Sequence, residues 1–86
     1  MPEISRFLGI IISLNYREHL PPYFHAHCRG HQATIAIQTG SVLEGSLPPR
    51  VAGLVFEWAM LHRPELAEDW ALAQQQAPLK KIAPLE

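Results

Sequence analysis

Histidine is concentrated in one short stretch of this chain. Four of the five histidines lie between positions 19 and 31, within and just before the segment PPYFHAHCRGH. Histidine side chains exchange protons near neutral pH and are also the commonest metal ligands in proteins. The stretch therefore indicates where chemistry would take place, and it allows three interpretations: acid/base catalysis, metal binding, or a polar binding surface.

The first interpretation is acid/base chemistry on a phosphodiester. His25 and His27 are two positions apart, so on a β-strand both side chains would point to the same side of the sheet. Imidazoles can donate and accept the protons that move in RNA cleavage, and an arginine such as Arg17 can hold a phosphate through paired hydrogen bonds. We take His25, His27 and Arg17 as candidate catalytic residues and leave open whether the protein is an enzyme. The candidate binding residues around them are His19, Tyr23, Arg29, Gln32 and Thr34.

The second interpretation, a metal site, needs more ligands than one strand supplies. Zn²⁺ usually takes three or four protein ligands in a tetrahedral array. His25 and His27 would provide two, and His19 or Glu18 would have to provide the third. We assign no metal ligand and no cofactor on this pattern. The third interpretation treats both histidines as solvated strand residues without a catalytic role.

Alternating apolar residues predict strands in the first half of the chain. Positions 9–17 form the first predicted strand, and its expected buried face consists of Ile10, Ile12, Leu14 and Tyr16. Two further strands should form a hairpin about the turn Arg29-Gly30. The expected pairs across this hairpin are Cys28 with His31, Ala26 with Ala33, and Phe24 with Ile35. His25, His27, Gln32 and Thr34 then share the other, more polar face.

After the prolines at 48 and 49, apolar residues no longer recur at every second position but recur with the spacing of a helix. Before them, Thr39-Gly40-Ser41 is typical of a turn, and positions 42–44 predict a fourth strand ended by Gly45. The predicted fold is α+β: a four-stranded, mostly antiparallel sheet followed by a helical hairpin packed on one face. We expect one domain over 1–86, with strands in 1–47, two helices in 48–77 and an extended tail in 78–86. The expected core is Phe7, Ile10, Ile12, Leu14, Phe24, Ile35, Ile37, Leu54, Val55, Trp58, Leu66 and Trp70.

The composition narrows the class of protein. A chain of 86 residues with 48% hydrophobic and 17% charged residues is typical of a folded domain with few surface charges, which a partner could cover. The net charge of −1 provides no general attraction to nucleic acid. Cys28 is the single cysteine, which favours a reducing compartment, and no apolar run reaches the roughly 18 residues of a membrane span. We expect a cytoplasmic protein without membrane contact.

Longer segments of the sequence resemble a known family. They are ISRFLGIIISLNY, EHLPPYFHAH, LPPRVAGLVFEWAMLHRPELAEDW and PLKKIAPLE. Together they are similar, over essentially the whole chain, to the small bacterial family catalogued as domain of unknown function number 4160. Members typically show an acidic residue and His, then Pro-Pro followed by His-Phe-His-Ala. Here Glu18, His19, Phe24, His25 and Ala26 match this pattern, whereas Tyr23 replaces the usual first histidine, which argues against an essential metal ligand there.

The resemblance implies a partner and does not imply a reaction. The family has no assigned activity, and its genes often lie beside those of another small family in an arrangement resembling a toxin–antitoxin module. The resemblance therefore implies a toxin-like protein with a cognate small partner encoded nearby, and small toxins of this type commonly act on RNA. A sheet with exposed edges also favours association, so we expect a complex with that partner, a homodimer, or both, with RNA as the candidate target. A partner-binding subunit without catalysis and a histidine-based metal-binding module are the alternatives.

Overall fold

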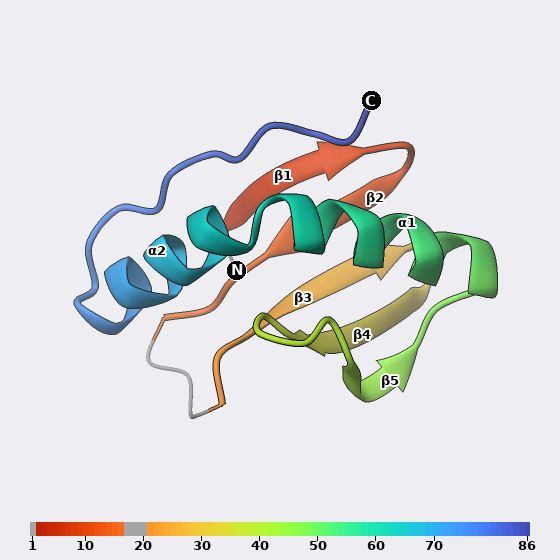
Figure 1. Ribbon diagram of the computed structural model, residues 1–86, viewed down its shortest axis with the longest axis horizontal. Helices are drawn as coiled ribbons and strands as arrows, with labels where there is room; N and C mark the ends of the chain where they lie inside the picture. Colours follow the sequence, from red (N-terminus) through yellow and green to blue (C-terminus); the bar gives the residue numbers. More distant parts are fainter. Residues whose placement is uncertain (1, 17–20) are drawn as a thin grey trace.

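The computed structural model describes residues 2–16 and 21–86, with five strands preceding two helices. The strands are β1 (Glu3–Phe7), β2 (Ile10–Ser13), β3 (Tyr23–Cys28), β4 (His31–Ala36) and β5 (Val42–Ser46), and the helices are α1 (Pro49–Leu61) and α2 (Arg63–Gln74). All neighbouring strands pair antiparallel, in the order β1-β2-β3-β4-β5 (Figure 1). The predicted α+β class is confirmed.

The sheet has five strands and not the four predicted, because positions 3–7 form a strand of their own. This strand, β1, pairs with β2 so that Phe7 lies opposite Ile10. The turn between them consists of Leu8 and Gly9, with φ angles of 50° and 80°. Positive φ at both central residues is the geometry of a tight hairpin, but leucine rarely adopts it. A Leu-Gly pair therefore does not suggest a hairpin.

The strand predicted over 9–17 is also shorter in the structure. β2 ends at Ser13, and Leu14 is buried while its N–H donates a hydrogen bond to the carbonyl oxygen of Pro2 at 3.1 Å. The prediction was wrong for Tyr16, which is 38% exposed and is not part of the buried face. Alternation fixes the direction of side chains only where strands are paired, and this pairing ends before Tyr16.

The hairpin of β3 and β4 has the predicted register. Cys28 lies opposite His31, and the pairing continues through every residue of both strands. Arg29 and Gly30 form the turn with φ angles of 47° and 83°, as a two-residue hairpin requires. The hairpin is therefore confirmed in its turn, its register and the residues that face each side.

β5 continues past the residue that was expected to end it. Gly45 lies inside the strand, opposite Ala33, with a φ angle of 75°. A Cβ at this position would collide with the backbone carbonyl oxygen of Gln32. The register of β4 and β5 shifts between Thr34 and Ile35, so the strand contains an irregularity that glycine accommodates and does not end there.

The two helices lie on one face of the sheet, but they do not form the predicted helical hairpin. α2 continues away from α1 and does not fold back beside it (Figure 1). Only His62 separates them: its N–H bonds to the Trp58 carbonyl at 3.0 Å, and its own carbonyl accepts the N–H of Leu66 at 2.9 Å. Antiparallel helices are joined by loops of about 2–5 residues, so one residue bends the chain without reversing it.

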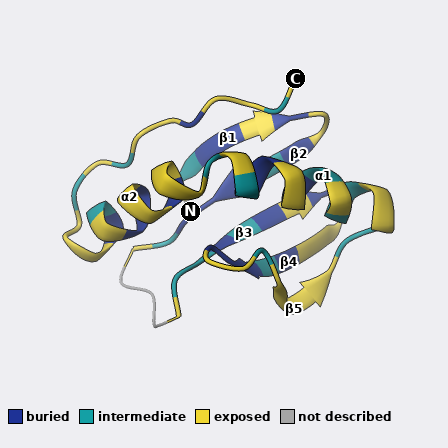
Figure 2. Cartoon of the chain, viewed as in Figure 1, coloured by how far each residue is buried: buried dark blue, intermediate teal, exposed yellow. Residues whose placement is uncertain are grey.

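The core lies between the sheet and the helices (Figure 2), and it includes Trp58. Trp58 is fully buried, and its ring centroid lies 5.5 Å from that of Phe7 and 5.8 Å from that of Phe24. Eleven of the twelve residues predicted for the core are buried, and Leu54 is partly buried against the others. Two sequence patterns therefore predicted residues of one shared core: the alternation of apolar residues before the prolines and their helical spacing after them.

The residues after α2 return along the sheet and cover the edge at β1 (Figure 1). The N–H of Ile82 bonds to the carbonyl oxygen of Ile4 at 2.8 Å, and the indole N–H of Trp58 bonds to the carbonyl oxygen of Ala83 at 2.9 Å. Ile82 itself is buried. None of the helices within the described residues is long and apolar enough to cross a membrane.

Candidate functional site

The strand register aligns ten residues into two rows on the face of the sheet opposite the helices. The first row takes one residue from each strand: Glu3, Ser13, His25, Thr34 and Glu44. The second row is Arg6, Ile11, His27, Gln32 and Ser46. We call these ten residues the histidine face. Nine of them are polar or charged at neutral pH or titrate near it, with Ile11 as the exception, whereas the opposite face supplies the core.

The ring of His25 is held on three sides. Its Nδ1 lies 3.4 Å from the hydroxyl oxygen of Thr34, on the paired strand. Its ring meets that of Tyr23 edge to face at a centroid distance of 5.4 Å. The residue is half-buried, and its Nε2 atom has almost no exposed surface. His25 is therefore more constrained than a solvated strand residue, and it contributes to packing as well as to the polar face.

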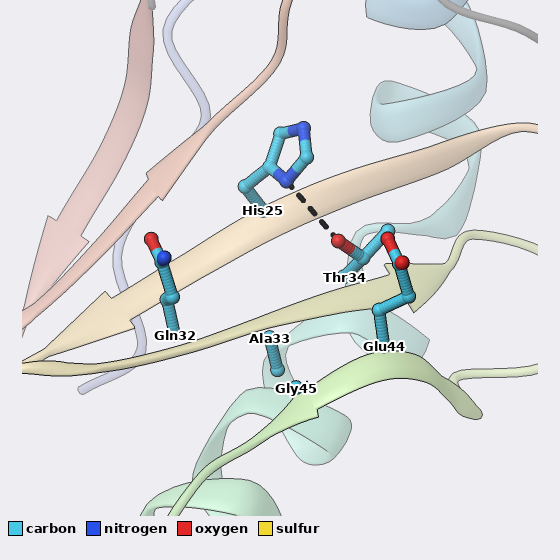
Figure 3. Close-up of a pocket in the computed structure, with 6 residues that line it drawn as sticks. All are labelled: His25, Gln32, Ala33, Thr34, Glu44 and Gly45. Carbon is cyan, nitrogen blue, oxygen red and sulfur yellow. Dashed lines mark hydrogen bonds between the residues drawn. The ribbon is translucent and has the colours of Figure 1, made fainter.

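A hollow of about 380 Å³ lies beside this histidine. Figure 3 shows the six residues that line it: His25, Gln32, Ala33, Thr34, Glu44 and Gly45. The Thr34 side chain lies between His25 of β3 and Glu44 of β5, and its hydroxyl points toward the His25 ring (Figure 3). The hollow therefore brings together an imidazole and a carboxylate, which are groups that can transfer protons.

Glu44 is the member of this group that the sequence candidates do not include. Its place in the hollow depends on the pairing of β5 with β4 beyond the register shift, where Glu44 lies opposite Thr34. Alternation counted from Thr34 could have indicated the carboxylate only if the position of the bulge were known. His27 and Gln32 lie opposite each other in the second row and are both exposed, as predicted for the polar face.

Two of the remaining candidates can be placed in the structure, and neither lines the hollow. Tyr23 is partly buried and contacts Trp70 at a centroid distance of 5.5 Å, so it joins the histidine face to the core. Arg29 is at the tip of the hairpin and lines a different cavity with His31. Because it is four residues from His25 along a strand, about 13 Å, it does not belong to the hollow. Arg17 and His19, like the alternative ligand Glu18, lie outside the described residues.

Potential metal ligands do not gather anywhere in residues 2–16 and 21–86. No group of three or more His, Cys, Asp or Glu side chains there could hold an ion. On the histidine face, the Arg6 guanidinium instead contacts the Glu3 carboxylate at 2.7 Å. This ion pair lowers the pKa of Glu3 and raises that of Arg6, with the hydrogen bond between them as the main cause.

A second surface feature lies along the free edge of the sheet. Every residue of β5 is exposed, and Val42 and Leu43 keep 48% and 45% of their surface accessible. Phe56 on α1 is 49% exposed, and its ring lies next to the turn at Gly40 that leads into β5. We call Val42, Leu43 and Phe56 the β5 apolar patch. Among the described strands, β5 has an uncovered edge, whereas the tail covers the edge of β1.

Comparison with known proteins identifies the family. The family model described as Domain of unknown function (DUF4160) matches residues 9–71. The match covers β2 to β5, α1 and most of α2, and with them the hollow and the β5 apolar patch. This chain therefore belongs to the DUF4160 family. No curated protein and no solved structure matches the chain.

Proposed function

We propose that this protein is the protein-binding subunit of a two-protein module of the toxin–antitoxin type, acting in the cytoplasm, and that β5 receives an extended segment of the partner. The observation that supports this is the uncovered edge of β5, which is exposed along its whole length and carries the β5 apolar patch. An open edge offers backbone N–H and C=O groups to an incoming strand. Apolar side chains next to that edge would add burial to the new hydrogen bonds.

The occupant is a different protein and not a second copy of this chain. If two β5 strands paired antiparallel along their full length, the central residue Glu44 would lie opposite itself. Like charges directly opposite each other destabilise a pair of strands. A strand with a basic residue opposite Glu44, and apolar residues near Val42 and Leu43, would complement the edge. The expected partner segment therefore has alternating apolar residues and a central lysine or arginine.

Binding of the purified product of the adjacent gene tests this proposal. Isothermal titration should show a complex, and Val42→Lys with Leu43→Lys should weaken it about tenfold or more, because charge on an edge strand opposes pairing. The matched control is Leu61→Lys, because Leu61 is 63% exposed on α1 and is not part of the β5 apolar patch. Equal affinity of the double variant, or an equal loss in the control, would contradict docking at β5.

The proton-transferring group in the hollow supports a second candidate, cleavage of RNA. In this reaction the Glu44 carboxylate would take the proton from a ribose 2′-hydroxyl, and that oxygen would attack the adjacent phosphorus. His27, which is exposed on the same face, would give a proton to the 5′-oxygen that leaves, so the proton taken by one group is balanced by the proton given by the other. The supporting observation is the row that joins His25, Thr34 and Glu44 across three strands.

Nuclease activity and stability should be measured on the same preparations. Glu44→Gln and His27→Gln should each lower the rate of RNA cleavage by about 10²–10⁴-fold while the melting temperature stays close to that of the parent. Ser46→Ala, on the same face but outside the hollow, is the control and should keep the rate. Absence of cleavage by the parent protein, or unchanged rates in both variants, would leave partner binding as the function of this chain.

A further inference from the structure

A second cavity lies at the end of the sheet where two hairpin tips meet the start of α1. Its volume is about 520 Å³. The β1–β2 turn contributes Leu8, the tip of the β3–β4 hairpin contributes Arg29 and His31, and α1 contributes Arg50, Val51 and Leu54. Cavities of roughly 300–1,000 Å³ accommodate small molecules. This one is on the opposite side of the sheet from the histidine face and is not used by the function proposed above.

Two guanidinium groups of this cavity have no partner in the part of the chain that the structure describes. Within the described residues, Arg29 and Arg50 form no hydrogen bond and no ion pair. The other described arginines differ: Arg6 pairs with Glu3, and Arg63 donates a hydrogen bond to the sulfur of Met60 at 2.8 Å. No carboxylate lines the cavity, so its charge is uniformly positive or neutral.

The start of α1 adds to this positive character. The helix begins at Pro49 after Pro48, with no side-chain cap and with no acidic residue in its first turn. The first N–H groups of a helix have no partner within the helix and carry a partial positive charge. Helix α1 therefore brings unneutralised positive potential to the same place as Arg50. The two arginines and the cavity are the main evidence for an anion-binding site, and the positive start of α1 is consistent with it.

The lining combines this charge with apolar surface. Leu8 is 68% exposed at the rim, although leucine in a turn with positive φ is unfavourable. Val51 and Leu54 form part of the wall, and both are only partly buried. A simple inorganic ion would contact the arginines and leave this apolar surface in water. An anionic group attached to an apolar body would use both.

From these features we infer that the cavity formed by Leu8, Arg29, His31, Arg50, Val51 and Leu54 binds a phosphate monoester whose organic part is apolar or aromatic. Guanidinium groups bind phosphate oxygens in a paired geometry. The two guanidinium groups together carry two positive charges. They therefore balance the charge of a phosphate monoester, which is close to −2 above its second pKa of about 6. The apolar wall receives the organic part.

Phenyl phosphate is the probe for this inference. It is titrated into ¹⁵N-labelled full-length protein at about pH 7.5, where the phosphate is mostly dianionic, with ionic strength held constant. Saturable amide shifts should appear at the β3–β4 turn and in the first turns of α1. Inorganic phosphate, which lacks the ring, and benzoate, which carries one negative charge, should each bind at least about tenfold more weakly. Equal affinity for either, or no saturation with phenyl phosphate, would overturn the inference.

Substitution of the two arginines tests whether phenyl phosphate binds in this cavity. Arg29→Asn removes the guanidinium while placing at positive φ a residue that tolerates this conformation, and Arg50→Gln removes the second charge from the exposed start of α1. Each should weaken phenyl phosphate binding about tenfold or more without lowering the melting temperature. The control is Arg63→Gln, which removes the same charge at the start of α2, some 20 Å from Arg50 along the helix axis. Unchanged affinity in both variants, or an equal loss in the control, would refute the assignment.

Discussion

Asp69 shows how a single buried carboxyl group sets a pH dependence. Its side chain on α2 has no exposed surface. One carboxylate oxygen accepts a hydrogen bond from the backbone N–H of Lys80 at 2.8 Å, while the other is buried with no partner among the described residues. Burial raises the pKa of Asp69, and the Lys80 hydrogen bond offsets only part of this effect. The folded protein therefore holds the Asp69 proton more tightly than the unfolded chain does.

The sign of the resulting pH effect follows by linkage. Because the folded-state pKa is the higher one, the contribution of Asp69 to stability is fully present below its unfolded value of 3.8 and is lost as the pH rises through the raised value. Asp69→Asn keeps the acceptor for Lys80 but cannot ionise. The free energy of unfolding of this variant, minus that of the parent, should increase as the pH rises through this window. Urea unfolding at a series of pH values measures it, and a constant difference would contradict the raised pKa.

The two histidines of the candidate site differ in their surroundings, and this difference can be measured. His25 is half-buried against Tyr23 and Thr34, whereas His27 is exposed. His25→Ala should therefore lower the free energy of unfolding by about 1–2 kcal/mol, because it removes a hydrogen bond and a ring contact. His27→Ala should change it by no more than about 0.5 kcal/mol. Equal effects in chemical denaturation would show that the two rings are equally solvated.

At the scale of the elements, the sequence pattern predicted those strands and turns whose structure depends on residues close together in the chain. The β3–β4 hairpin follows from alternation and a turn ending in glycine, so its register and the shared face of His25, His27, Gln32 and Thr34 could be predicted. Strand β1 could not be predicted in this way, because its turn requires a positive φ angle at Leu8, and leucine rarely adopts such an angle. The hollow could be predicted only in part, because the carboxylate of Glu44 enters it through a register shift that alternation does not reveal and that lies next to Gly45.

That glycine provides a test at the scale of the strand. Gly45→Ala places a Cβ against the carbonyl oxygen of Gln32 in addition to the strain of positive φ. Gly30→Ala introduces the strain alone, since nothing lies within 4 Å of a Cβ there. We expect Gly30→Ala to cost about 1 kcal/mol and Gly45→Ala clearly more. Hydrogen exchange should show loss of protection between β4 and β5 only in Gly45→Ala, and equal costs would show that β5 can shift without penalty.

At the scale of the whole molecule, one edge of the sheet is covered by other residues of the chain and the other edge is exposed. The tail closes the β1 edge through Ile82, while β5 remains uncovered and carries exposed apolar residues. An uncovered apolar edge risks unspecific pairing unless a partner occupies it. The contrast between the two edges is therefore what makes partner binding at β5 the function that the architecture supports best. It also means that the stability of the sheet depends on residues more than seventy positions away from β1.

The tail should therefore behave as part of the fold. Ile82 is 5% exposed. Beside it, the Ala83 carbonyl oxygen accepts the indole N–H of Trp58, and the Lys81 ammonium donates to the carbonyl oxygen of Glu3 in β1. Ile82→Ala should lower the free energy of unfolding by about 2–4 kcal/mol through lost burial and a remaining cavity. Ala83→Ser is the control: its side chain is exposed, and its backbone carbonyl still accepts the indole N–H. A loss below about 1 kcal/mol in Ile82→Ala, measured by urea unfolding, would mean that the β1 edge does not depend on the tail and is as open to partners as β5.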